Sequence, residues 1–269
     1  MSTATRTAPR DRDAQRAALV AAAHRRGVRS TAEYAVNATW YVGVWFWAIA
    51  ILVGGIILFF MQRSDDVDLT AVSSVAESAR FYLLVMGIVL PLSMVALHVA
   101  AGGTRRAFAH GLWCAAAVTG VTYGLASAVV TWCQWWLFTR NGWPAEAAQE
   151  QLYEDGSEFG LVLLVHSLFC AVYFLAGTVV ALGYYRSGFW GGTALVLVAL
   201  VPVVLVEVSL QSGWFGRALA EWVGIPLAPV WGAALGGLAA FALAALLVRL
   251  VLRGVAVRPV EFARSVSSV

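Results

Sequence analysis

The sequence contains no lysine, and all eighteen of its basic residues are arginine. Without lysine the chain has no P-loop lysine to hold nucleotide phosphates, so it is not a standard NTPase by itself. It also has no side chain of the kind that forms a Schiff base with a carbonyl substrate. Two classes of chemistry are excluded before any motif is considered.

Charged residues are scarce, at 12% of the chain, which is about half of what a soluble domain usually carries. Hydrophobic residues make up 61%, and the mean hydropathy is +0.77. Six apolar runs are long enough to cross the roughly 30 Å of bilayer hydrocarbon as helices. The predicted spans are residues 40–61, 81–101, 111–138, 159–183, 191–210 and 228–252. The predicted fold class is therefore all-α, a polytopic membrane protein with six transmembrane helices.

Cysteine is rare, and Cys114, Cys133 and Cys170 all lie in apolar runs without a CxxC pair. This pattern indicates small hydrophobic residues, not a disulfide set. The sequence has no HExxH motif and no GxSxG motif, and its cysteines and histidines lack the spacing of zinc ligands. We therefore expect no catalytic residue, no metal site and no cofactor in this chain.

The arginine distribution predicts the orientation in the membrane. If the N-terminus lies inside, fourteen of the eighteen arginines fall on cytoplasmic segments, seven of them before the first span. Under the positive-inside rule, both termini are predicted to lie in the cytoplasm. The absence of lysine is typical of a high-GC bacterial genome, so the predicted location is a bacterial plasma membrane.

Three regions follow from this topology. Residues 1–39 are predicted to be a cytoplasmic N-terminal segment, residues 40–252 the transmembrane domain and residues 253–269 a cytoplasmic tail. Residues 13–27 have strong helix formers, an acidic start and a glycine at the end, so they predict an amphipathic helix that stops at Gly27. Its arginines suit it to lie along the anionic inner membrane surface.

Small residues recur at every fourth position in the third and sixth spans. This spacing lets helix backbones approach each other closely. The packing is expected either within the bundle or across a dimer interface. The candidate helix-packing glycines are Gly120, Gly124, Gly232 and Gly236.

Polar side chains inside spans are costly in lipid and are therefore candidates for function. Glu207 is the only carboxylate within a predicted span. Glu207 has several possible roles. It could form an ion pair with Arg80 or Arg217, accept a hydrogen bond from His166, or line a cavity or carry protons. His98 and His166 are expected at depths that differ by roughly 15 Å, so they cannot ligate one haem iron. The candidate intramembrane polar residues are His98, Gln134, His166 and Glu207.

A short basic turn, Gly102-Gly103-Thr104-Arg105-Arg106, interrupts the apolar sequence between spans two and three. Glycine ends a helix, Thr104 suits the cap of a short helix over residues 105–111, and arginines anchor at headgroups. A purely topological role is one interpretation of this turn. A second basic turn, residues 183–190, joins spans four and five.

The first turn and its flanking spans resemble the permease subunits of type-2 ABC exporters, of the small six-span actinobacterial kind. The resemblance covers about residues 40–210 and rests on Gly102 to Phe108, on Gly142-Trp143 and on the Tyr185-Arg186-Ser187-Gly188 element. It implies that the turn is a coupling helix that seats in a separate ATPase subunit, which binds ATP and Mg. The implied coupling residues are Gly102, Gly103, Thr104, Arg105, Arg106, Phe108, Tyr185 and Arg186. It further implies that the helix before span one is an interface helix, and that two permeases, identical or sister chains, pair around a central path.

We therefore expect the transmembrane permease subunit of an ABC exporter, not an enzyme in itself. Its expected partners are an ABC ATPase subunit, a second permease chain and the lipid bilayer, and no nucleic acid. One alternative is a membrane scaffold or assembly protein that moves nothing. The other is an ATP-independent secondary transporter, which the lack of a clear internal repeat and the off-centre Glu207 disfavour. Nothing in the sequence names a substrate.

Overall fold

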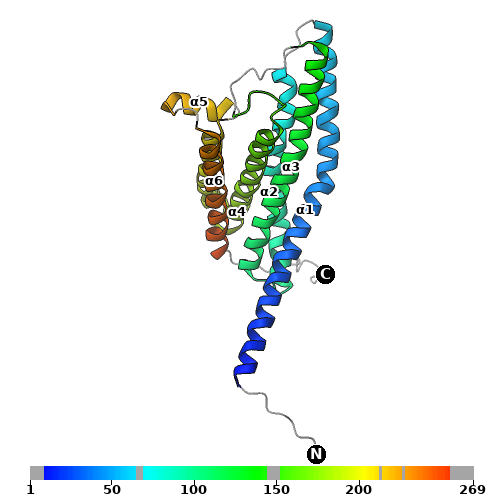
Figure 1. The fold of residues 1–269 in the computed structure, drawn as a ribbon. Helices are drawn as coiled ribbons and strands as arrows, with labels where there is room; N and C mark the ends of the chain where they lie inside the picture. Colours follow the sequence, from blue (N-terminus) through cyan, green and yellow to red (C-terminus); the bar gives the residue numbers. More distant parts are fainter. Residues whose placement is uncertain (1–8, 65–68, 144–151, 212–213, 226–227, 255–269) are drawn as a thin grey trace, which may run out of the picture.

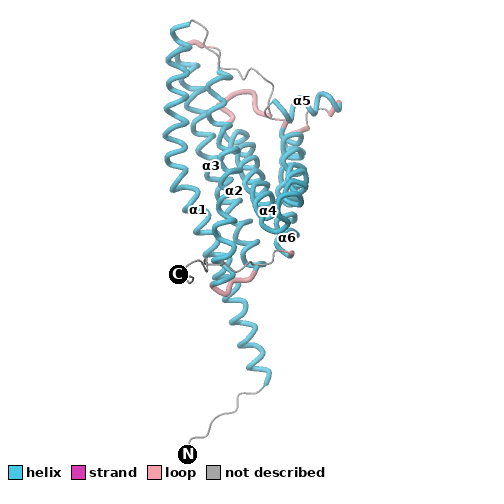
Figure 2. The backbone as a smooth tube through the Cα atoms, turned by 180° about the vertical axis from the view of Figure 1, so that it is seen from behind, coloured by secondary structure: helices cyan, strands magenta, loops and turns pink. Residues whose placement is uncertain are grey.

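The computed structural model describes residues 9–64, 69–143, 152–211, 214–225 and 228–254. Within these ranges the chain forms helices joined by turns, with no strand (Figure 2). Five of the helices are long and apolar enough to cross a membrane. They are α1 (Pro9–Ser64), α2 (Leu69–Ala100), α3 (Arg105–Asn141), α4 (Phe159–Leu210) and α6 (Val230–Arg253), and α5 (Trp214–Val223) is a short helix between the last two. The prediction of an all-α polytopic membrane protein is confirmed.

Helix α4 contains both the fourth and the fifth predicted spans, because the chain turns back at Gly188. This glycine has φ +67° and ψ −162°, a conformation that residues with a side chain rarely adopt. The hydroxyl of Tyr173 lies 2.6 Å from the Glu207 carboxylate, although a straight helix would separate these residues by about 50 Å. The two halves of α4 therefore run antiparallel, and the bundle crosses the apolar layer six times.

The first half of α4 lies in the middle of the bundle. Helix α4 packs against α2, α3 and α6, while α1 packs on the outside of α2 and α3 (Figure 1). Phe174 and Leu175 of α4 are fully buried and join a core that includes Leu83 of α2 and Leu112 of α3. The contacts between spans are thus made mainly by apolar side chains.

Two glycines let the backbones of α2 and α4 come into direct contact. A Cβ atom on Gly177 would collide with the carbonyl oxygen of Leu84, and one on Gly87 would collide with that of Phe174. No side chain fits at either position without a shift of the facing backbone. Neither glycine was among the packing residues predicted from the sequence.

The N-terminal helix does not end at Gly27, contrary to the sequence prediction. Gly27 lies inside α1, which runs without a break into the first span. The reason is packing: a Cβ atom on Gly27 would lie 3.1 Å from the Cβ of Ala107 and 3.5 Å from the His98 ring, so this glycine allows α1 to contact the start of α3. The part of α1 before His24 extends beyond the bundle (Figure 1).

The loop that precedes α4 lies at the far end of the bundle. Its residues 152–157 form bends and turns. Tyr153 in this loop is buried, at 7% exposure. Helix α5, which was not predicted, lies across this end of the bundle (Figure 1). Of the predicted tail, only Arg253 and Gly254 are described.

Candidate functional site

Each residue of the first basic turn has a local structural cause. Gly102 adopts φ +80°, which favours glycine. A Cβ atom on Gly103 would collide with the imidazole of His98. Thr104 is the N-cap of α3, because its hydroxyl accepts a hydrogen bond of 3.1 Å from the backbone N–H of Ala107. The predicted short helix over residues 105–111 is instead the start of the long, continuous α3.

His98 fastens this turn to two other helices. Its Nδ1 lies 3.1 Å from the Thr31 hydroxyl of α1, and its Nε2 lies 3.3 Å from the Thr104 carbonyl oxygen. The His98 ring packs at 5.1 Å from the ring of Phe108, which is 1% exposed. Phe108 therefore supports the turn from within the bundle and does not lie on the surface open to a partner, as a direct coupling contact would require.

The two basic turns meet at the C-terminal end of α6. Arg105 Nη1 donates to the carbonyl oxygen of Arg253 at 3.5 Å, and Arg186 Nη1 donates to that of Val251 at 3.5 Å. The last carbonyls of a helix and the negative end of its dipole attract cations, which explains this convergence. We call Arg105, Arg106, Arg186, Arg249 and Arg253 the arginine-rich end of the bundle.

Most of these guanidinium groups are open to a partner. Arg105, Arg106, Arg186 and Arg253 are exposed, and Arg249 is half-buried. None of the five forms a salt bridge within the part of the chain that the structure describes. Tyr185 is half-buried and packs on the core beside Arg186, so the second turn, like the first, is held by an aromatic ring.

A cavity of about 240 Å³ lies within the arginine-rich end, between α3 and α6. His110 of α3, which lines this cavity, contacts His24 of α1, with 3.2 Å between the ring nitrogens. We call this cavity the arginine pocket, and its lining consists of Arg105, Arg106, Ala109, His110, Arg249, Leu252 and Arg253.

The predicted candidate Glu207 lies near the opposite end of the bundle, in a buried cluster of charges. Arg80 of α2 places Nη1 3.3 Å from Glu207 Oε1 and Nη2 3.1 Å from Glu77 Oε2. Tyr173 donates to the same Glu207 oxygen. Glu207 and Arg80 are 3% and 8% exposed. We call Glu77, Arg80, Tyr173 and Glu207 the ion cluster.

The ion cluster selects among the alternatives raised for Glu207. Arg80 is its ion-pair partner, whereas Arg217 pairs with Glu221 at 2.7 Å. His166 is buried at 6% exposure, but it makes no hydrogen bond to Glu207 among the described residues. The carboxylate is thus held by a guanidinium and a phenol and joins α2 to both halves of α4.

The surroundings of the ion cluster are apolar and closed. The Arg80 guanidinium lies over the rings of Phe81 and Phe169, at 5.1 and 5.0 Å. Tyr153, in the loop between α3 and α4, is buried beside the ion cluster. Burial together with the charge of Glu77 raises the pKa of the Tyr153 phenol. Glu207 Oε2 and Arg80 Nε have no hydrogen-bond partner in the described residues. The arrangement suits a structural clamp, because water is largely excluded from its charges.

The packing glycines fall into two groups. A Cβ atom on Gly120 would lie 2.7 Å from the Ala171 Cβ, and one on Gly124 would lie 2.7 Å from the backbone nitrogen of Ser167, so both face α4. Gly236 likewise faces Ser209 of α4. The atoms nearest to a Cβ on Gly232 belong to Ala228 and Pro229 of its own segment, at 3.6 Å. Three of the four thus serve packing within the bundle.

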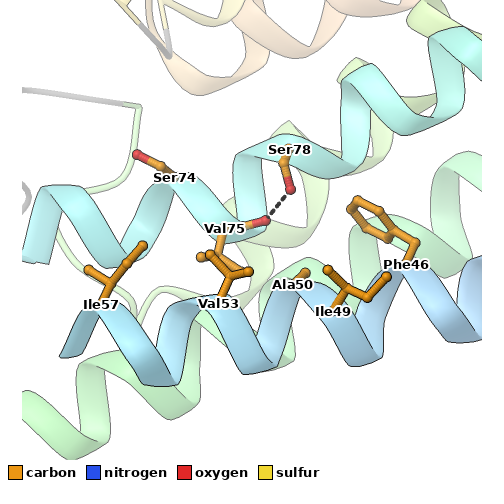
Figure 3. Close-up of a pocket in the computed structure, with 8 residues that line it drawn as sticks. All are labelled: Phe46, Ile49, Ala50, Val53, Ile57, Ser74, Val75 and Ser78. Atoms are coloured by element: carbon orange, nitrogen blue, oxygen red, sulfur yellow. Dashed lines mark hydrogen bonds between the residues drawn. The ribbon is translucent and has the colours of Figure 1, made fainter. Parts of the chain in front are cut away.

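A second cavity, an apolar groove of about 360 Å³, lies between α1 and α2 (Figure 3). Its only polar side chains are serines, and Ser78 donates its hydroxyl proton to the Val75 carbonyl oxygen at 2.6 Å. Its described lining residues include no charged group that could contact a charged ligand. The lining residues are Phe46, Ile49, Ala50, Val53, Ile57, Ser74, Val75 and Ser78.

The remaining candidates add no catalytic arrangement. Gln134 is half-buried in α3. Within the described ranges, no three His, Cys, Asp or Glu side chains are grouped so as to hold a metal ion. Comparison of the chain with protein-family models, with curated proteins and with solved structures found no match. The functional argument therefore rests on the arginine-rich end and the ion cluster.

Proposed function

We propose that the chain is the membrane-spanning permease subunit of an ABC exporter, driven by a separate ATPase that docks on the arginine-rich end. The observation that carries the proposal is the convergence of both basic turns on the end of α6, through Arg105 and Arg186. A partner that presses on this end acts on α3, α4 and α6 together. In this proposal the end faces the cytoplasm of a bacterial cell, as do both termini.

The way the first turn is held supports its role in force transmission. His98 links it to α1 and α2, and Phe108 anchors it in the core. Thr104 makes it continuous with α3, so a push on Arg105 or Arg106 moves a helix of 37 residues as one body. A turn with these attachments transmits displacement to the spans, whereas a loosely tethered loop would absorb it.

The alternatives have less support from the geometry. A proton-coupled carrier would depend on Glu207, but this carboxylate is paired with Arg80 and hydrogen-bonded by Tyr173. A scaffold protein needs no rigid connection between the basic turns and the spans. We therefore give the permease function priority, with nucleotide chemistry assigned to the partner.

The test is purification of the tagged full chain from native membranes in mild detergent, followed by mass spectrometry of the proteins that co-purify. We expect a P-loop ATPase with the wild type and its loss in the Arg105→Glu, Arg106→Glu double variant. The matched control is Arg63→Glu with Arg140→Glu, which makes the same charge change at exposed residues of the opposite end and should leave the ATPase bound. An ATPase retained by both variants, or found with none of the proteins, would refute the proposal.

A further inference from the structure

The arginine pocket presents cations on both of its walls. On α3, residues 105, 106, 109 and 110 share one helix face, and on α6 residues 249, 252 and 253 follow the i, i+3, i+4 spacing of one face. Four guanidinium groups and one imidazole thus surround a cavity of about 240 Å³. Ala109 and Leu252 complete the lining.

Among the residues that the structure describes, no acidic side chain lines this pocket. None of its four arginines forms a salt bridge with another described residue, and Arg105 finds only the Arg253 carbonyl oxygen, at 3.5 Å. Cations held this close repel one another, and an anion bound between them offsets that repulsion. The lining therefore indicates an anionic ligand.

The chemistry of arginine and the position of the pocket narrow the choice of anion. The planar guanidinium fork donates paired hydrogen bonds that match a phosphate group. The pocket lies where α3 begins and α6 ends, and the ends of membrane-spanning helices lie at the level of the lipid headgroups. A phosphate of a membrane lipid is therefore present at high local concentration beside this site.

The surface of α6 below the pocket suits an acyl chain. Leu246 and Leu250 share a helix stripe with Arg249 and Arg253, at the spacing i, i+3, i+4, i+7. The two leucines are 49% and 44% exposed, so they present apolar surface to the bilayer next to the pocket. A lipid can contact both the arginines and this apolar surface, whereas free phosphate can contact only the arginines.

We propose that the arginine pocket binds the phosphate group of an anionic phospholipid, whose acyl chains lie along Leu246 and Leu250. The site requires only this chain and the bilayer, and its α6 wall, Arg249 and Arg253, lies outside the two basic turns. The lipid site can therefore be tested separately from the proposed docking of an ATPase. A bound lipid would neutralise the pocket and join α3 to α6 through its headgroup.

The experiment uses the full chain, purified and delipidated in detergent without any ATPase. Native mass spectrometry measures the binding of added phosphatidylglycerol, with zwitterionic phosphatidylcholine as the matched lipid. We expect selective binding of phosphatidylglycerol by the wild type, weakened about tenfold or more in Arg249→Gln with Arg253→Gln, since each removes charge-assisted hydrogen bonds. Arg63→Gln with Arg140→Gln, at the opposite end, should bind as the wild type does.

A further arm separates the two sources of phosphate. Inorganic phosphate at the same concentration should fail to displace the lipid, because it cannot contact the leucines. Equal binding of both lipids, unchanged binding in the α6 variant, or a site that takes inorganic phosphate and retains no lipid would each overturn the proposal. Arg106→Gln, an exposed substitution on the α3 wall, repeats the test if the α6 variant does not fold, and it should also weaken binding of phosphatidylglycerol.

Discussion

Tyr173 and Glu207 lie 34 positions apart in the sequence, in the two antiparallel halves of α4, and the Tyr173 hydroxyl donates a hydrogen bond of 2.6 Å to the Glu207 carboxylate. Their contact follows from the reversal of the chain at Gly188. The same carboxylate accepts from Arg80 of α2, so one buried oxygen joins three crossing segments. The ion cluster is therefore expected to hold the halves of α4 in register, whereas the arginine-rich end is the proposed docking surface for the ATPase.

The first prediction concerns the energetics of the ion cluster. Arg80→Met leaves the buried Glu207 carboxylate without its cation, and Glu207→Gln leaves the buried Arg80 cation with one fewer anion. Each should lower the free energy of unfolding by about 3 kcal/mol, as breaking a buried pair typically does. The double variant should cost clearly less than the sum, with a coupling of about 2 kcal/mol. Unfolding of the detergent-solubilised protein measures all three.

The matched control for this cycle is the exposed pair of Arg29 and Glu33, which lie 2.6 Å apart on α1 with side chains 79% and 57% exposed. Arg29→Met with Glu33→Gln should leave the unfolding transition where it is, because water already solvates both groups. Strict additivity of the Arg80 and Glu207 substitutions would show that the two groups do not stabilise each other.

The second prediction concerns topology. Since α4 reverses at Gly188, we predict that the chain crosses the membrane six times with both termini on one side, and the arginine distribution predicts that this side is the cytoplasm. Green fluorescent protein fused to either terminus should fluoresce, and alkaline phosphatase fused to either should be inactive. If α4 crossed only once, the two termini would report opposite sides.

The third prediction concerns the contact of α2 with α4. Gly177→Ala places a methyl group against the Leu84 carbonyl oxygen, which belongs to the backbone and cannot swing aside. We expect a loss of about 2 kcal/mol in the free energy of unfolding, a typical cost of overpacking. Gly160→Ala is the control in the same helix, because a Cβ there meets no atom within 4 Å, and its effect should be neutral. An equal response of both variants would contradict the close approach.

The fourth prediction concerns the first basic turn. Gly103→Ala pushes a methyl group into the His98 imidazole and should weaken the attachment of the turn, lowering stability by about 2 kcal/mol. Gly102→Ala meets open space, so its cost is limited to the strain of φ +80°, about 1 kcal/mol. Thermal unfolding of His98→Ala, with and without Gly103→Ala, checks the mechanism. Removal of the ring should relieve most of the Gly103→Ala effect, and an undiminished effect would show another cause.

The sequence was sufficient for the spans because long apolar runs are a local property of the chain. Four of the six predicted ranges lie within observed helices, while 81–101 ends one residue after α2 and 228–252 begins two residues before α6. Helix α5 was missed because its ten residues are too few for a span. The glycine at 27 was misjudged because a helix end and a close approach of two helices both favour glycine, and only the position of α3 distinguishes them.

The sequence predicted some members of the site, such as Glu207 and Arg105, but it predicted neither Glu77 nor Tyr173 and none of the contacts between helices. The sequence predicts Arg80 or Arg217 as the ion-pair partner of Glu207, and only the tertiary structure decides between them. The convergence of Arg105 with Arg253 depends on the packing of α3 against α6, which no periodicity in either segment reveals. Gly87 has no small residue four positions away and Gly177 has only Ala181, so neither marks a packing row as long as those in spans three and six.

The most direct test of the account is site-specific photocross-linking in native membranes. A photoreactive benzoylphenylalanine replaces Arg106 on the exposed arginine-rich end or, as the control, Arg140 on the exposed opposite end. Mass spectrometry then identifies the cross-linked proteins. The account predicts a P-loop ATPase cross-linked from position 106 and none from position 140. Cross-links from position 106 that contain only other proteins would contradict the assignment of this end as the ATPase docking surface.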